Sequence, residues 1–586
     1  MAKATGGKRE MTVSRRGVLA LMSSSTALVI PRVAAAQGPR EVRFMHGVAS
    51  GDPAANGAVI WTRATPEGGF AGDIPLLWFV ADAPDAEPVA SGEVIARASA
   101  DHTAKVVIEG LEPARDYHYW FQGPGSVRSS AGRFRTLPVG ATEQVVFAVV
   151  SCQLYPGGLF NAFSDIAQLP RLDAVVHLGD YIYEYGEDGY GAEIGRRIGR
   201  LPDPPHEIVT LTDYRRRHAQ VKTDPDMQAA HARAAFICVW DDHEVTNDGW
   251  LGGAENHQPE TEGDWVTRKT AAMQAYFEWM PIRDPEPGRA REAIFRSFEF
   301  GDLATLAMVE TRLLARSEQA IPKGELPAQE QVPALLAERE RPERELLGEA
   351  QRDWLHGVLA RSVEAGKPWQ VLGNQVVMAR VAGPDLQASL GDEAYAAMRE
   401  QMPEAYRGQI DRALAGYRAG VPFNLDSWDG YPHARERLYQ TFRSAGSRPL
   451  VLSGDSHASW ANNLHDADGR LVAVEVGCTA ITSPSYGSIL PGLGRFLAHA
   501  NDEVEYCDQD NKGYALVTLT PGSARAEYVT VSTVLAKPFE RQVAARFQAA
   551  PGPGGSGLVH VAEGADCVVD VQGDISSLCD GADTRL

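Results

Sequence analysis

Possible metal ligands follow four apolar segments of this 586-residue sequence, each at the point where the segment gives way to polar residues. The segments are residues 145–150, 174–178, 236–240 and 449–453, and the residues that follow them include Cys152, Asp180, Tyr183, Asp241, Asp242, His243, Glu244, Asp455 and His457. Ligands of layered α/β proteins bind at the carboxyl ends of strands. We therefore expect these side chains, which are far apart in the chain, to meet around one site.

This set of side chains suits a centre of two or more cations. Carboxylate oxygens suit calcium-like or magnesium-like ions, whereas thiolate, phenolate and imidazole groups suit a transition metal. Closely spaced cations neutralise phosphoryl oxygens, generate hydroxide near neutral pH and stabilise a leaving oxygen. One carboxylate must bridge the cations, because it offsets their mutual repulsion. An enzyme that hydrolyses phosphate esters with metal ions would need such a set of side chains.

Two patterns of secondary structure surround these residues. From residue 145 onward, continuous apolar strands alternate with helical stretches, which is typical of an α/β domain whose sheets are covered on both faces. Residues 40–138 instead show short strands rich in β-branched and aromatic residues, separated by turn signals such as Gly51-Asp52-Pro53. The sequence predicts an immunoglobulin-like β-sandwich over 40–138, a catalytic domain over 145–535 and a poorly ordered tail over 551–586.

The motifs at the strand ends can be compared with known families. Gly-Asp-x-x-Tyr at 179–183 is similar to a block of the calcineurin-like metallophosphoesterase superfamily, while Asp-His-Glu at 242–244 stands where that superfamily has Asn-His-Glu. Gly-Asp-Ser-His at 454–457 stands in place of Gly-His-x-His, and Cys152 replaces an Asp. This combination resembles the PhoD-like alkaline phosphatases and phosphodiesterases, and the resemblance spans roughly residues 40–535.

The resemblance implies a fold and a role for each matching residue. The implied fold is a four-layer αββα metallophosphoesterase sandwich preceded by the β-sandwich. The implied cofactors are Fe³⁺ and Ca²⁺: Cys152, Asp180, Tyr183 and His457 would hold the iron, and Asp180, Asp242 and Asp455 a calcium-like ion. His243 would face the substrate as the catalytic residue, stabilising the transition state or protonating the leaving group. The family is also thought to use a second calcium, whose ligands we do not assign.

The anionic ligand shell predicts activity at alkaline pH. Cys152, Asp242 and Asp455 replace neutral or weaker partners, so the bound water should have a higher pKa than in a neutral shell. We expect the rate of the purified, metal-replete enzyme to peak above pH 7. A pH–rate profile with its optimum well below pH 7 would contradict this expectation.

The sequence predicts a twin-arginine signal peptide over residues 1–36. Arg15-Arg16 precedes a short apolar run, and Ala34-Ala35-Ala36 forms a small-residue cleavage site. The run is too short to serve as a transmembrane segment. We therefore expect export by the twin-arginine route, with the mature chain in the periplasm or secreted.

The net charge argues against polyanionic partners. Removing residues 1–36 takes away six basic residues and one acidic residue, which changes the formal net charge from −21 to −26. An acidic surface repels nucleic acid and anionic membranes, so we expect neither as a partner. A site for a small-molecule phosphate ester must therefore carry local positive charge, from metal ions or from arginines such as Arg63, Arg268 or Arg435.

Several other residues have simpler interpretations. We interpret His177 and Cys238 as core residues, and a disulfide between Cys567 and Cys579 is compatible with an exported protein. Asp429 and Tyr431 suit either a contact with a cap or a structural turn. Glu310 stands where the family is expected to have Asp, and we assign it no ligand role.

Together, these observations predict an alkaline phosphatase or phosphodiesterase that hydrolyses phosphate mono- and diesters with a metal-bound hydroxide. Two alternatives stay open. One is a phospholipase D-type phosphodiesterase on the same site, since pocket shape decides between them. The other is a non-catalytic cell-envelope binding protein, although structural metal sites are usually closed by protein ligands.

Overall fold

This computed structural model describes residues 41–321, 328–402 and 404–562. The predicted signal peptide, Cys567 and Cys579 lie outside the described residues. Within the described ranges, no helix has the length and apolar character needed to cross a membrane.

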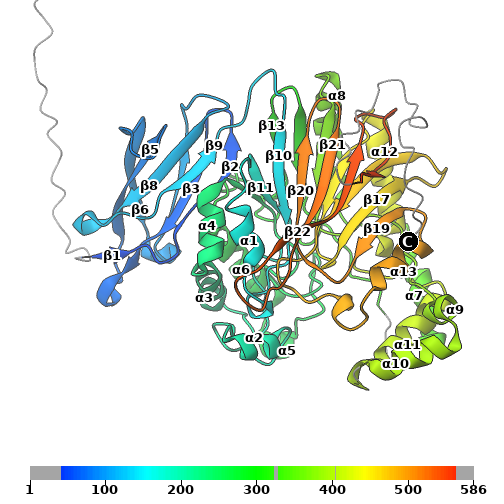
Figure 1. Cartoon of the computed structure of the whole chain (residues 1–586). Helices are drawn as coiled ribbons and strands as arrows, with labels where there is room; N and C mark the ends of the chain where they lie inside the picture. The colour runs from blue at the N-terminus through cyan, green and yellow to red at the C-terminus, as the bar shows by residue number, and fades with distance from the viewer. Residues whose placement is uncertain (1–40, 322–327, 403, 563–586) are drawn as a thin grey trace, which may run out of the picture. The chain divides into compact units, whose positions relative to one another are not determined.

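Two large β-sheets dominate the described part of the chain (Figure 1). In spatial order, the ten-stranded sheet contains β23 (Val559–His560), β22 (Arg541–Ala549), β21 (Ala524–Val531), β20 (Lys512–Leu519), β10 (Val145–Val150), β11 (Ala174–His177), β12 (Phe236–Cys238), β2 (Val48–Ala54), β3 (Gly57–Arg63) and β7 (Thr103–Ile108). The seven-stranded sheet contains β13 (Arg296–Phe300), β14 (Ala304–Met308), β15 (Trp369–Gly373), β16 (Leu450–Ser453), β18 (Leu471–Gly477), β17 (Ser459–His465) and β19 (Val504–Asp508).

The two sheets face one another across the main core. Phe147 of β10 and Phe300 of β13 meet edge to face with their ring centroids 5.0 Å apart. Alternate residues of the strands point to opposite faces of a sheet. Val371 therefore joins the core between the sheets, whereas Leu372 joins a second core beneath the outer helices. This arrangement confirms the predicted α/β sandwich.

Helices pack on the outer faces of both sheets, and others lie beyond the sheets (Figure 1). Their bounds are α1 (Asn161–Ile166), α2 (Ala192–Ile198), α3 (Leu211–Lys222), α4 (Pro225–Arg233), α5 (Pro259–Glu262), α6 (Trp265–Trp279), α7 (Ala328–Arg339), α8 (Gly348–Glu364), α9 (Leu386–Leu390), α10 (Asp392–Gln401), α11 (Glu404–Arg418), α12 (Pro432–Ser444) and α13 (Leu493–Ala500). Short 3₁₀ turns are η1 (Glu67–Gly69), η2 (Ala98–Ala100), η3 (Pro124–Ser126), η4 (Tyr155–Gly157), η5 (Trp428–Gly430) and η6 (Tyr486–Ser488). Local signals fix several helix starts: Thr210 and Asp213 form a capping box before α3.

The N-terminal β-rich region forms a smaller sandwich, one layer of which belongs to the ten-stranded sheet. A four-stranded sheet of β6 (Ala90–Ala96), β5 (Ile74–Ala81), β8 (Asp116–Gln122) and β9 (Gly132–Arg135) shares a core with β3 and β7, and β1 (Val42–Arg43) pairs with β4 (Thr65–Pro66). The sequence did not indicate that β2 also pairs with β12, through Gly51 and Phe236. A Cβ atom at Gly51 would lie 2.5 Å from the Phe236 carbonyl oxygen, so glycine permits this approach. One sheet therefore runs from the N-terminal sandwich into the α/β region.

The chain after residue 535 is more ordered than the sequence pattern indicates. β22 extends the ten-stranded sheet, and β23 pairs with it inside the predicted tail. Arg448 donates to the carbonyl oxygens of Gly552 (2.6 Å) and Ser556 (2.9 Å), and Leu558 is buried. The prediction of poor order from residue 551 is therefore wrong as far as residue 562, and the rest of the tail lies outside the described residues.

Candidate metal centre

Four strand ends converge on one buried centre. β10, β11 and β12 are parallel neighbours, and Cys152, Asp180 and Asp242 follow their carboxyl ends. β16, from the facing sheet, is followed by Asp455 and His457. Possible ligand atoms lie within 4.8 Å of one another in three overlapping groups: Cys152, Asp180 and His457; Asp180, Asp242 and His243; and Asp241, Asp242 and Asp455. The structure thus brings these sequence-predicted residues together, including Asp241, to which the family resemblance gave no role.

Tyr183, the remaining predicted ligand, borders the first group. Its hydroxyl donates to Asp180 Oδ2 at 2.9 Å and lies 3.4 Å from His457 Nε2. It also lies 2.7 Å from the hydroxyl of Ser483, whose Oγ donates to the Cys152 carbonyl oxygen. The phenol is therefore placed where it can reach the same centre as the thiol and the imidazole.

The backbone at these strand ends is in the left-handed region. Cys152, Asp180, Asp455 and His457 have φ values of 60°, 58°, 60° and 57°. This conformation costs residues other than glycine about 1–2 kcal/mol each, and strain of this kind clusters at functional sites. Gly179 has a φ of 109°, and a Cβ atom there would lie 2.4 Å from Asp241 Cβ. Tight turns at the ends of neighbouring strands thus aim the candidate ligands at one centre.

The electrostatics of the centre fit bound cations. Burial, the largest influence, raises the pKa of Asp180 and of Asp455 well above the usual range, and the Asp241 carboxylate raises both pKa values further. Burial and the Asp180 carboxylate likewise raise the pKa of the Cys152 thiol. Asp180 Oδ1, Asp241 Oδ2 and Asp242 Oδ1 are buried without a hydrogen-bond donor from the described residues. Crowded, buried anions with unused oxygens are stabilised by cations, so the side chains present fit a metal cluster.

His457 is oriented by its second ring nitrogen. Nδ1 lies 2.7 Å from the Pro484 carbonyl oxygen, which only accepts, so Nδ1 carries the proton and Nε2 faces the centre. Burial, with a smaller contribution from the Lys512 cation, lowers the pKa of His457 to about 3. The ring is therefore neutral, which is the form that binds metals.

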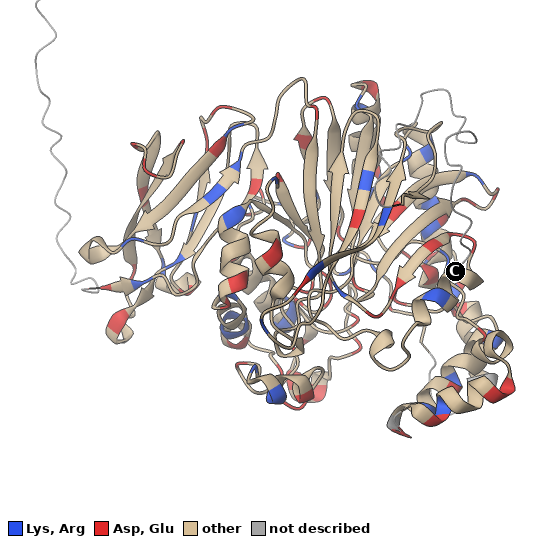
Figure 2. Cartoon of the chain, viewed as in Figure 1, with Lys and Arg blue, Asp and Glu red and all other residues tan. Residues whose placement is uncertain are grey.

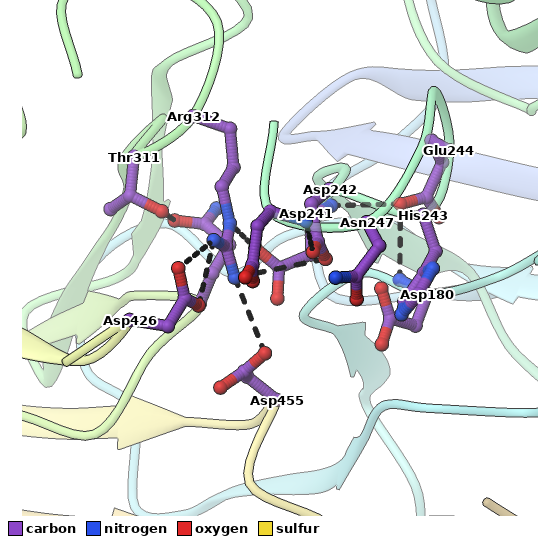
Figure 3. A network of polar contacts seen from close by, with 12 residues as sticks. Asp180, Asp241, Asp242, His243, Glu244, Asn247, Thr311, Arg312, Asp426 and Asp455 are labelled. Carbon is purple, nitrogen blue, oxygen red and sulfur yellow. Dashed lines mark hydrogen bonds and ion pairs between the residues drawn. The ribbon is translucent and has the colours of Figure 1, made fainter. Parts of the chain in front are cut away.

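Arg312 is a buried residue of the centre that sequence reasoning missed. Its side chain is fully buried, and its guanidinium contacts Asp426 Oδ2 at 2.7 Å and Asp455 Oδ1 at 3.2 Å. It also contacts Asp241 and approaches Asp242 Oδ1 to 3.7 Å (Figure 3). One internal cation therefore already compensates part of the acidic cluster.

Glu310 serves to position Arg312. Its carboxylate accepts backbone N–H groups of Arg312 at 2.9 Å, Leu313 at 2.6 Å and Leu314 at 3.0 Å. It also accepts the indole N–H of Trp240 at 3.0 Å. These contacts hold the turn that carries Arg312, so Glu310 has a structural role beside the centre.

Glu244 plays a similar positioning role for the strand ends. Its carboxylate accepts the backbone N–H groups of Asp180 at 3.0 Å, Tyr181 at 2.6 Å and Asp241 at 2.8 Å. It therefore ties the turn after β11 to the turn after β12. The Asp-His-Glu motif at 242–244 thus provides a candidate ligand, a histidine and a backbone clamp.

Glu184 holds His243 in place. Glu184 Oε2 lies 2.6 Å from His243 Nδ1, and Oε1 accepts the Asn247 backbone N–H at 2.9 Å. Burial opposes protonation of His243, but the neighbouring carboxylates, first among them Glu184 and Asp242, outweigh it and raise its pKa. Because an ionised carboxylate only accepts, Nδ1–H donates to Glu184 and Nε2 is left to face the centre.

Replacing Glu184 with glutamine should reduce activity through His243. Glutamine keeps the shape of the side chain but removes the negative charge and can present an N–H group to Nδ1. A carboxylate that orients an active-site histidine typically contributes about 10–100-fold to activity. We therefore expect the activity to fall by a factor in that range, mainly through kcat. Kinetics of the variant on a model ester check this, with Glu255→Gln, an exposed carboxylate near Asn247, as the matched control. Equal effects of the two substitutions would contradict the positioning role.

Other residues singled out in the sequence lie in the scaffold. Arg63 pairs with Asp101, Arg268 with Glu207 and Glu262, and Arg435 with Asp429. The Tyr431 hydroxyl donates to the Ser317 carbonyl oxygen at 2.9 Å, so the Trp428–Gly430 turn and Tyr431 are structural. His177 and Cys238 are fully buried, and His177 Nε2 lies 3.0 Å from Gln153 Oε1.

The comparisons with known proteins agree with this geometry. Residues 147–528 match the family model of the PhoD-like phosphatases, and residues 31–138 match that of their N-terminal domain. The chain belongs to the PhoD-like phosphatase family. It is 34% identical over 499 residues to alkaline phosphatase D of Bacillus subtilis (strain 168), a match that covers 83% of this chain and 77% of that protein.

The three-dimensional comparison supports the same assignment. A solved structure titled "Structure of PhoD" superposes with a TM-score of 0.72 at 32% identity, covering 91% of this chain and 94% of that one. This PhoD-like phosphatase is therefore a phosphoric ester hydrolase, and its family implies that the activity depends on metal. The family assignment favours the enzyme over the non-catalytic envelope protein.

Proposed function

We propose that this PhoD-like phosphatase hydrolyses phosphate mono- and diesters at a cluster of Fe³⁺ and Ca²⁺. The observation that carries the proposal is the overlap of three ligand groups, two of which share Asp180 and two of which share Asp242. Shared carboxylates are what a multinuclear centre requires. A single-ion site would need only one such group.

The types of ligand support the choice of metals. The thiol of Cys152, the phenol of Tyr183 and the imidazole of His457 would hold iron together with Asp180, because softer and aromatic donors suit a transition metal. Asp180, Asp242 and Asp455 would hold calcium, since hard cations prefer carboxylate oxygens. Asp241, whose Oδ2 has no donor among the described residues, is a further candidate ligand at the carboxylate end of the cluster.

The chain's own residues supply the remaining chemistry. When bound, the cations would neutralise the phosphoryl oxygens and activate water. His243, with Nδ1 fixed by Glu184, offers Nε2–H to the phosphoryl group or to the leaving oxygen as the P–O bond breaks. Arg312 keeps Asp241, Asp426 and Asp455 in place around the centre.

Export through the twin-arginine route to the periplasm or beyond also belongs to this proposal. It rests on Arg15-Arg16, the apolar run after them and the small residues at 34–36. Cell fractionation of the full chain and of a variant with both arginines changed to lysine tests it. Equal export of the two proteins would contradict the twin-arginine route.

Chelation and reconstitution test the proposed chemistry. The purified enzyme is assayed on p-nitrophenyl phosphate and bis(p-nitrophenyl) phosphate before and after removal of its metals. We expect chelation to abolish both activities and iron plus calcium to restore them. Full restoration by zinc or manganese alone would contradict the proposed metals, and the absence of hydrolysis in metal-replete enzyme would contradict the function.

A further inference from the structure

An apolar groove lies between α11 and the segment around η6 and α13. It encloses about 180 Å³. An engineered apolar cavity of roughly 150 Å³ holds one benzene molecule, so this groove has room for a ring or a short alkyl chain. The side chains that line it and carry the argument are Leu386, Ile410, Ala413, Phe423, Tyr486 and Leu490.

The sequence of α11 explains one wall of the groove. Tyr406, Ile410, Ala413, Leu414 and Tyr417 line the groove and recur at helical spacing. The charged residues of the helix occupy other positions, and both signs of charge are spread along α10 and α11 (Figure 2). The helix thus turns an apolar stripe toward the groove and a polar face toward solvent.

Two aromatic residues of the groove lie close in the chain to residues that contact the candidate metal centre. Phe423 and Tyr486 meet across it with ring centroids 5.6 Å apart. Phe423 lies three residues before Asp426, which pairs with Arg312. Tyr486 lies two residues after Pro484, whose carbonyl oxygen accepts from His457 Nδ1. Both rings therefore stand on segments that also contact the centre.

Tyr486 forms an exposed part of the groove wall. The surrounding protein, followed by Asp455 and Asp248, raises the pKa of the Tyr486 phenol. The side chain nevertheless keeps 58% of its surface exposed, as expected for a residue on the wall of an open groove. Water covers this surface in the free protein. An apolar group that binds there would displace the water, which favours binding.

We propose that this groove binds the apolar alkyl or aryl group of a phosphodiester while its phosphoryl group lies at the metal centre. The inference rests on the proposed function and adds a substrate class to it: diesters with one apolar alcohol. A polar alcohol such as glycerol or a sugar would bury no apolar surface in this groove and would not be bound more tightly by it. Burial of apolar surface would instead raise kcat/KM for the apolar diesters, because the binding energy is available in the transition state.

A series of soluble diesters tests the proposal. Methyl, butyl and hexyl p-nitrophenyl phosphate share one leaving group, and hydrolysis of each releases p-nitrophenol and the alkyl phosphate. We expect kcat/KM to rise with chain length, by up to about fourfold for each methylene that leaves water. Ile410→Asn should flatten this dependence without changing the rate on the methyl ester, because Ile410 is half-buried on the groove wall and contacts no candidate ligand.

Two further variants complete the design. Ala413→Phe should fill the groove and reduce the rate on the hexyl ester but not on the methyl ester. Ile95→Asn, the same substitution as at Ile410 but on a 41% exposed residue of β6, is the matched control and should keep the wild-type dependence on chain length. A chain-length dependence that is absent, or that is unchanged in both groove variants, would overturn the inference. Failure to hydrolyse any ester, including the methyl ester, would instead contradict the proposed function.

Discussion

Asp180→Asn should lose nearly all activity, with kcat/KM falling on the order of 10³-fold or more. Asp180 belongs to two of the three candidate ligand groups and is fully buried at the end of β11. An amide at this position removes the charge that would compensate two cations at once. The expected loss therefore exceeds the 10²–10³-fold typical of deleting one hydrogen-bond donor at a reacting centre.

The measurement is steady-state kinetics with metal-content analysis of the same preparation. Asp188→Asn, in an exposed position of the same loop, is the matched control and should leave kcat/KM unchanged. The variant should be folded, as judged by circular dichroism, and should hold less metal than the wild type. A folded Asp180→Asn enzyme with wild-type metal content and rate would refute the bridging role.

Arg312→Met is the second substitution with a large expected effect, chiefly on stability. The guanidinium is fully buried against Asp241, Asp426 and Asp455, and methionine leaves these carboxylates without their shared counterion. Removing one partner of a buried ion pair typically costs about 3–5 kcal/mol, and we expect the free energy of unfolding of the metal-free protein to fall by that amount.

Denaturant unfolding of the metal-free proteins measures this effect. Arg341→Met is the matched control, because Arg341 forms ion pairs with Glu338 and Glu343 on the exposed surface. Exposed ion pairs contribute little to the free energy of unfolding, so this variant should be as stable as the wild type. Equal stability of Arg312→Met and the wild type would show that the acidic cluster does not depend on Arg312.

The candidate ligands could be predicted because each one follows a recognisable apolar strand. Parallel neighbours end at the same edge of a sheet, so the pattern of strand ends was enough to bring Cys152, Asp180 and Asp242 together. Asp455 and His457 come from the facing sheet, and their motif identified them. The α/β sandwich and the N-terminal β-rich region were predictable for the same reason, since periodicity is a local signal.

Arg312 and Glu184 were not identified from the sequence, because their partners are distant in the chain. Arg312 is 143 positions from Asp455 and 71 from Asp241, and only the packing of the two sheets brings them together. Glu184 is 59 positions from His243. The pairing of β2 with β12 depends likewise on one contact of Gly51, which reads as a turn residue in the sequence.

Elemental analysis of the purified, active enzyme tests most directly whether the four strand ends enclose a cation cluster. The convergence of Cys152, Asp180, Asp242 and His457 predicts near-stoichiometric iron together with calcium. An enzyme that hydrolyses phosphate esters at full rate with neither metal, or with zinc or manganese in their place, would contradict this account.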